Sequence, residues 1–73
     1  MTEYKWQQAT TAWDQGVPTD PTPEGWDIED GPDGAWMPFA VVPMSFLHND
    51  AMGTVPVFLP CTYWRRLIKR ETE

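Results

Sequence analysis

The sequence predicts a small α+β domain, in which a short antiparallel sheet lies between an N-terminal and a C-terminal helix. Two observations predict the helices, because apolar residues recur at helical spacing in residues 4–15 and again in residues 62–70. A third observation predicts the sheet, since short apolar segments between these two regions are separated by turn-forming residues. The length of 73 residues indicates one domain, residues 1–73.

The first helix is predicted from an apolar stripe at positions i, i+3 and i+7 of residues 4–15. The stripe consists of Trp6, Ala9 and Trp13. Gly16 follows and is a good helix stop signal. Residues 17–25 hold three prolines, so we expect them to form an extended, irregular linker within the domain.

Three strands are predicted at residues 26–29, 35–42 and 54–59. The first alternates apolar and polar residues, as a half-buried strand does. Prolines in the other two cannot donate to a strand ladder, which predicts edge or interrupted strands. Residues 44–53 are expected to form a loop, in which Gly53 permits an unusual backbone angle.

The second helix is predicted at residues 62–70, where four apolar residues would form one face and four cations the other. The cations are Arg65, Arg66, Lys69 and Arg70, and they are the first group of candidate partner-binding residues. A functional interpretation is contact with nucleic acid or with an acidic protein surface. The alternative is a solvated face that complements the acidic remainder of the chain.

The chain from Trp6 to Trp64 contains no Lys or Arg, yet it holds eight of the eleven carboxylates. Carboxylates are densest in residues 27–33, where they could face a basic partner while the flanking tryptophans act as aromatic anchors. The alternative is a solvated polar turn with both tryptophans in the core. The candidate partner-binding residues of this segment are Trp26, Asp27, Glu29, Asp30, Asp33 and Trp36.

The net charge of −6 disfavours general nucleic-acid binding by the whole molecule and favours a partner with a basic surface. Cys61 is the only cysteine, so an intramolecular disulfide is impossible. The N-terminus lacks the basic and apolar regions of a signal peptide, and the apolar runs are too short to cross a membrane. We therefore expect a cytoplasmic protein, and we expect it to be a monomer.

Candidates for chemistry are few in this sequence. His48 and Cys61 are the possible base and nucleophile, but nothing in their spacing brings them together. A calcium loop starting at Asp27 is disfavoured, because Gly31 stands at a ligand position and Pro32 where glycine is needed. No phosphate-binding loop or metal motif is present, so we expect no enzyme activity, no cofactor and no metal.

Two segments carry a resemblance to a known class of proteins: residues 26–36 (WDIEDGPDGAW) and residues 63–70 (YWRRLIKR). Over its full length the chain resembles small bacteriophage host-takeover proteins, and in particular phage-encoded RNA polymerase-binding transcription inhibitors and antiterminators. The resemblance implies a protein in the host bacterial cytoplasm that docks on the polymerase β′ subunit. It also implies interference with sigma-factor use and altered pausing or termination near the RNA exit channel.

Other functions fit the same composition. An acidic mimic of DNA would inhibit a host nuclease or a restriction or defence system, using the carboxylates of residues 27–33. A structural component of a virion and a minor enzyme using His48 or Cys61 are further alternatives. The leading expectation is a non-enzymatic regulator of transcription that acts by protein–protein contact.

Overall fold

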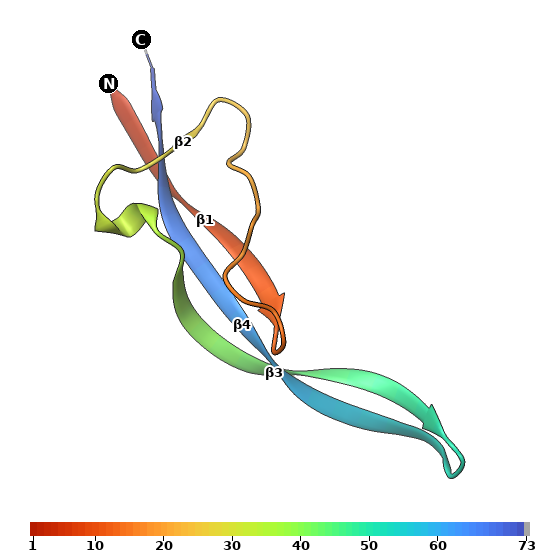
Figure 1. Cartoon of the computed structure of the whole chain (residues 1–73). Coiled ribbons are helices and arrows are strands. Elements are labelled where there is room, and N and C mark those ends of the chain that lie inside the picture. Colours follow the sequence, from red (N-terminus) through yellow and green to blue (C-terminus); the bar gives the residue numbers. More distant parts are fainter. Residues whose placement is uncertain (73) are drawn as a thin grey trace.

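The computed structural model describes residues 1–72 and shows an elongated, almost entirely β molecule (Figure 1). Its elements are β1 (Thr2–Ala12), β2 (Asp27–Ile28), the 3-10 turn η1 (Pro32–Gly34), β3 (Met37–Asp50) and β4 (Gly53–Glu71). The molecule measures 61 × 21 × 15 Å, and its radius of gyration is 17.0 Å. A compact chain of this length would have a radius of gyration of about 11 Å.

Strand β4 organises the whole fold, because the other three strands all pair with it in antiparallel orientation. One edge of its C-terminal half pairs with β1, from Thr2↔Glu71 to Ala12↔Cys61. The other edge of its N-terminal half pairs with β3, from Met37↔Arg65 to Asp50↔Gly53. The two pairings overlap only around residues 61–65, so this short stretch of β4 has a neighbour on both sides.

The predicted N-terminal helix is wrong, since residues 4–12 lie in strand β1 and a turn follows. The spacing of Trp6, Ala9 and Trp13 imitates a helical stripe. Residue types in the same segment favour a strand instead, because Thr10 and Thr11 are β-branched and aromatic residues lie nearby. Eleven register pairs with β4 then decide the outcome.

The predicted C-terminal helix is also wrong, because residues 62–70 belong to strand β4. The fold class is therefore a small antiparallel sheet, and the α+β prediction with two terminal helices does not hold. A strand was hard to recognise here because one face of β4 carries cations as well as apolar residues. Trp64 and Ile68 share that face with Arg66 and Arg70, which hides the usual alternation of apolar and polar positions.

The three predicted strands exist, but two of them are longer than expected. Residues 26–29 contain β2, and residues 35–42 hold the start of β3. The predicted loop at 44–53 is largely wrong, because β3 continues to Asp50 and a tight turn at residues 51–52 leads into β4. Gly53 does adopt the expected unusual angle, with φ of 115°.

The sheet has one covered and one open face over its β1–β4 half. Residues 13–36 leave β1 and pass over the face that carries the even-numbered residues of β4, burying Ile68 completely and leaving Arg66 7% exposed. We call this the covered face. The opposite face carries the odd-numbered residues of β4 and has no layer over it, so Tyr4 and Trp6 remain exposed there. We call it the open face.

The buried core is small and lies close to the covered face, except for Cys61, which is an odd-numbered residue of β4 and is buried on the other face. The buried residues other than glycine and proline are Ala9, Thr11, Cys61, Arg66 and Ile68. Ile68 is the largest side chain among residues 1–72 that is fully buried. Strand β1 and the C-terminal half of β4, with the segment 13–36 over them, therefore form the stable unit, which we call the body.

Beyond Cys61 the sheet narrows to a two-stranded ribbon formed by β3 and β4. We call this ribbon, residues 42–61, the arm; it projects away from the termini in Figure 1. Residues 13–36 do not reach it, and its large side chains are largely exposed, as at Leu47 (78%) and Phe58 (64%). An isolated two-stranded ribbon is marginally stable in water, so the arm depends on continuity with the body.

Candidate functional site

The first candidate residue, Arg66, is an internal structural group in the body. Its Nε donates to Oε1 of Gln7 at 2.8 Å, and Nη2 donates to the carbonyl oxygen of Asp20 at 2.9 Å. Its guanidinium carbon also lies 4.3 Å from the ring centre of Trp36. These contacts fasten the segment 13–36 to the sheet, and with 7% exposure Arg66 presents little surface to a partner.

Lys69 and Arg70 form the two ion pairs of the described residues. Lys69 Nζ lies 2.9 Å from Oδ2 of Asp30, and Arg70 Nη2 lies 2.6 Å from Oε2 of Glu3. The hydrogen bond from Lys69 to Asp30, together with the charge of that carboxylate, raises the pKa of Lys69 above its ordinary value of 10.5. Because both pairs are accessible to solvent, they tie chain segments together more than they add stability.

The remaining cations stack on aromatic rings. The guanidinium carbon of Arg65 lies 4.4 Å from the ring centre of Trp6 and 5.6 Å from that of Phe39. Lys5 lies 4.3 Å from the ring centre of Trp26. All five Lys and Arg side chains of the protein thus have a partner within the chain. The structure does not place the four C-terminal cations on one common face, because they alternate between the two faces of β4.

The two tryptophans that flank the acidic segment are half-buried and serve as stacking platforms. Trp26 lies against two cations, with Lys5 at 4.3 Å and Arg70 at 4.6 Å from its ring centre, and Trp36 lies against Arg66. A stacked cation contributes about 0.5–1 kcal/mol at an exposed site and more where it is desolvated. The rings therefore pack within the body, and only their remaining edges are available to another molecule.

The four candidate carboxylates divide into two kinds. Asp30 binds Lys69, and Glu29 accepts a hydrogen bond from the backbone nitrogen of Gly31 at 3.2 Å. Asp27 in β2 and Asp33 in η1 are exposed, and no ion pair within residues 1–72 includes either of them. Further exposed carboxylates without an ion pair in the same range lie along the segment that joins β1 to β2. They are Asp14, Asp20 and Glu24.

The body consequently presents carboxylates without a counter-charge to solvent, whereas its cations are engaged within the chain, Arg66 in a buried position and Lys5, Arg65 and Arg70 in exposed ones. Cations are held by Trp rings, Gln7, Asp30 and Glu3, while most carboxylates of residues 13–36 point to solvent without a counter-charge. Such a surface attracts proteins with a basic surface and repels nucleic acid.

His48 and Cys61 do not form a catalytic pair. His48 pairs with Val55 near the tip of the arm, and Cys61 pairs with Val42 at its base. Six register steps separate them, which corresponds to about 20 Å along a strand. Cys61 is also buried. Within residues 1–72 the structure contains no cluster of three or more His, Cys, Asp or Glu side chains suited to a metal ion.

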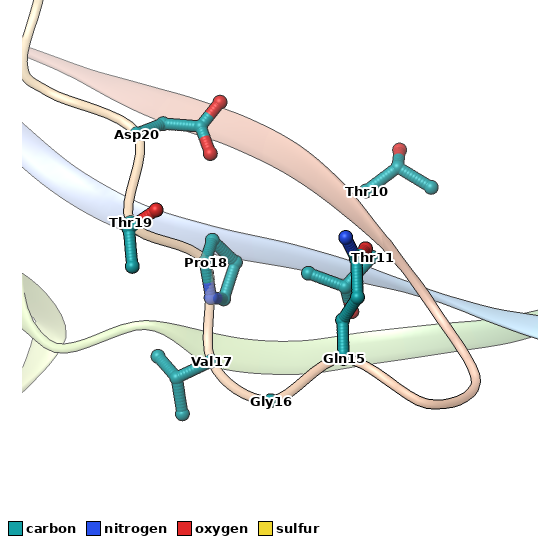
Figure 2. A pocket seen from close by; sticks show the side chains of 8 residues that line it. All are labelled: Thr10, Thr11, Gln15, Gly16, Val17, Pro18, Thr19 and Asp20. Carbon is teal, nitrogen blue, oxygen red and sulfur yellow. The ribbon is translucent and has the colours of Figure 1, made fainter.

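A hollow of about 370 Å³ lies between the end of β1 and the chain that returns over it (Figure 2). Its lining residues are Thr10, Thr11, Gln15, Gly16, Val17, Pro18, Thr19 and Asp20. The side-chain oxygen of Gln15 accepts a hydrogen bond from the backbone nitrogen of Ala12, which stabilises the turn after β1. Asp20 is the one titratable group in the lining, so the hollow offers hydrogen-bonding atoms but no acid–base pair.

Sequence reasoning missed the apolar open face of the arm. Six apolar residues of β3 and β4 lie on it: Val42, Met44, Phe46, Val55, Val57 and Leu59. Two cross-strand pairs, Met44↔Leu59 and Phe46↔Val57, are apolar on both strands, while Val42 pairs with Cys61 and Val55 with His48. Exposed fractions of 39% for Met44, 45% for Phe46 and 38% for Val55 show that no other segment packs on them. The alternation of residues 42–48 was the available signal, and it was obscured by the polar residues His48, Asn49 and Asp50, which with Gly53 favoured a loop.

Comparison with protein-family models, with curated proteins and with solved structures finds no match to this chain. Among residues 1–72, no helix has the length and apolar character that crossing a membrane requires.

Proposed function

We propose that this protein is a non-enzymatic regulator that binds a basic surface of a nucleic-acid-handling protein, and that bacterial RNA polymerase is that partner. The observation that carries the proposal is the segregation of charge in the body. Exposed carboxylates such as Asp27 and Asp33 lack a cationic partner among the described residues, whereas the cations are engaged within the chain.

The choice of polymerase follows from the resemblance to phage-encoded transcription inhibitors and antiterminators. Under this proposal the protein acts in the bacterial cytoplasm and docks on the β′ subunit through residues 27–33. The cations take a different part from the one expected from sequence, since they hold the body together. Direct contact with RNA or DNA through residues 65–70 is therefore not part of the proposal.

A second candidate is an acidic inhibitor of a host nuclease or of a restriction or defence system. The same observation favours it, because carboxylates that lack counter-charges can replace DNA phosphates on a basic surface. The two candidates share a recognition chemistry and differ in the protein that is recognised. The partner must therefore be identified by experiment.

The test is a binding measurement between the purified protein and bacterial core RNA polymerase at low and high salt. The Asp27→Asn, Asp33→Asn variant should bind more weakly and depend less on salt, because it removes two unpaired charges of the proposed surface. The control is the Asp14→Asn, Asp50→Asn variant, which changes the net charge equally at positions outside residues 27–33. Asp27 is level with Tyr4 of β1, since both pair with Lys69, and Asp14 lies in the turn beyond the other end of β1, which is about 26 Å further along the strand at Ala12.

Binding that is unaffected by the first variant, or weakened equally by the control, would refute the proposed surface. Failure to bind polymerase, with capture of a nuclease or restriction subunit from bacterial lysate, would replace the first candidate with the second. If neither class of protein binds, the charge-based proposal is wrong.

A further inference from the structure

The chain, with its projecting arm, exposes more surface than a folded monomer of this mass normally does. The accessible surface of the chain is 5461 Å², while a monomer of 8.4 kDa is expected to expose about 4,600 Å². The excess of about 850 Å² is close to the roughly 800 Å² that each partner buries in a stable protein–protein interface. The chain therefore has the surface of a molecule from which one partner has been removed.

The edges of the arm are poorly suited to that partner. Pro43 pairs with Pro60. Leu47, four residues further along β3 and on the same face, pairs with Pro56. A proline has no N–H to give to its cross-strand neighbour, so these pairs are of the non-hydrogen-bonded kind, in which backbone nitrogens point to the outer edges. Each proline thus removes one donor that an added strand would need, and the arm resists edge pairing.

The open face of the arm is the alternative, and its residues suit face-to-face packing. Cross-strand pairs Met44↔Leu59 and Phe46↔Val57 place four large apolar side chains together. The opposite face is less suited, because polar Ser45 lies in the middle of it, whereas the polar residues of the open face, His48 and Asp50, lie near the tip. Two apolar sheet faces that pack on each other enclose a layer about 10 Å thick, as in a β-sandwich.

We propose that the occupant is a second copy of this chain, and that two arms pack open face to open face in antiparallel orientation. Asp50 near the tip is the one formally charged residue of the arm, which leaves a net charge of −5 on the rest of the chain. By register Asp50 lies on the open face, next to the turn, and the rest of that face carries no formal charge. An apolar patch without formal charge is complementary to itself, as a two-fold interface requires. Antiparallel packing also directs the two acidic bodies to opposite ends, further apart than the ~8 Å over which charges repel at physiological salt.

The inference is independent of the proposed function, because the arm and residues 27–33 are separate surfaces. Dimerisation leaves the exposed carboxylates of residues 27–33 accessible. The oligomeric state and the binding of polymerase are therefore separate results, and either proposal can fail without the other. The expectation of a monomer from sequence is the competing result.

Sedimentation velocity across a dilution series of the full chain tests the inference. The wild-type protein should shift from a dimer to a monomer mass on dilution, and the Phe46→Lys, Val57→Lys variant should be a monomer throughout. The matched control is the Leu47→Lys, Phe58→Lys variant, which adds two charges to the opposite face and should still dimerise. Tryptophan fluorescence checks folding of the body in each variant, because all five tryptophans lie outside residues 42–61.

A crosslinking experiment covers the case in which the lysine variant fails to fold. In a Cys61→Ala background, a short bismaleimide should join two copies through Val57→Cys on the open face and should not join them through Leu47→Cys on the opposite face. A wild-type chain that stays monomeric at every concentration would overturn the inference. The inference would also be overturned if both lysine variants disrupted dimerisation equally. It would be overturned as well if the protein were a monomer that uses the open face of the arm to bind polymerase.

Discussion

Replacing Arg66 with alanine is the perturbation that best separates the structure from the sequence-based expectation. On the predicted helix, Arg65 and Arg66 were both solvent-facing cations, and their loss would have cost little stability. In the structure Arg66 is buried on the covered face, while Arg65 is exposed on the open face. The two neighbouring substitutions should therefore have very different effects on the free energy of unfolding.

The expected loss for Arg66→Ala follows from the contacts that disappear. Two charged hydrogen bonds, to Gln7 and to the Asp20 carbonyl, contribute about 1.5–3 kcal/mol each before the acceptors regain water. Stacking on Trp36 adds about 0.5–2 kcal/mol. Because freed acceptors on the rim of the body can be rehydrated, we expect a net loss of about 3 kcal/mol. That is a large part of the roughly 4–11 kcal/mol typical of a chain of this length.

Urea denaturation followed by tryptophan fluorescence measures both losses. Arg65→Ala should cost less than about 1 kcal/mol, because that side chain loses only exposed ring contacts. Arg66→Lys should recover little, since an ammonium group cannot make both hydrogen bonds of the guanidinium in this geometry. Losses for Arg65→Ala and Arg66→Ala that agree within 1 kcal/mol would refute the placement of Arg66.

Three further predictions concern the body. Ile68→Ala should lower the free energy of unfolding by about 2–5 kcal/mol in the same assay, because its side chain is 0% exposed. Gly34→Ala should also destabilise, by about 1–3 kcal/mol, because its Cβ would overlap a backbone carbonyl oxygen, whereas Gly16→Ala meets no atom within 4 Å and serves as control. The raised pKa of Lys69 means that its pairing with Asp30 stabilises the fold fully below pH 10.5 and is lost as the pH rises through that higher pKa. The stability difference between wild type and an Asp30→Asn variant should therefore stay constant from neutral pH to pH 10.5 and shrink above it, and a difference that grows above pH 10.5 would contradict the assignment.

The sequence was most informative where strands are short and bounded by turn formers. Residues 26–29 were recognised as a strand from their alternation of apolar and polar residues, and they contain β2. Residues 54–59 were also recognised, but they lie within β4, which continues past Pro60 to Glu71. The 30–34 region was also recognised as a turn, which the structure forms with η1. Local residue chemistry decides such segments, so no knowledge of tertiary contacts was needed.

The terminal segments could not be assigned correctly from sequence, because long-range pairing decides them. Residues 2–12 become a strand by pairing with residues 61–71, at the other end of the chain. On β4, Arg66 and Arg70 occupy covered positions because Trp36 and Trp26 from the connecting segment stack on them. A cation at a covered position breaks the alternation that identifies a strand.

The candidate site was predicted in part. The acidic character of residues 27–33 was visible in the sequence, and the exposure of Asp27 and Asp33 is compatible with the expected role. Which carboxylates are paired could not be foreseen, because Asp30 meets Lys69 from a segment 39 residues away. The open face of the arm was missed because residues 44–53 were expected to form a loop and the prolines to interrupt the strands beside it, although Pro43 and Pro56 are tolerated at edge positions of the ribbon.

Hydrogen exchange followed by mass spectrometry tests the central claim most directly, namely that one chain carries two separate interaction surfaces. Amides of residues 61–71 should be protected under all conditions, because β4 is paired with β1 there. Protection of residues 42–60 should rise with protein concentration, and protection of residues 27–33 should rise only when core RNA polymerase is added. Arm protection that is independent of concentration, or polymerase-dependent protection of the arm in place of residues 27–33, would contradict the account.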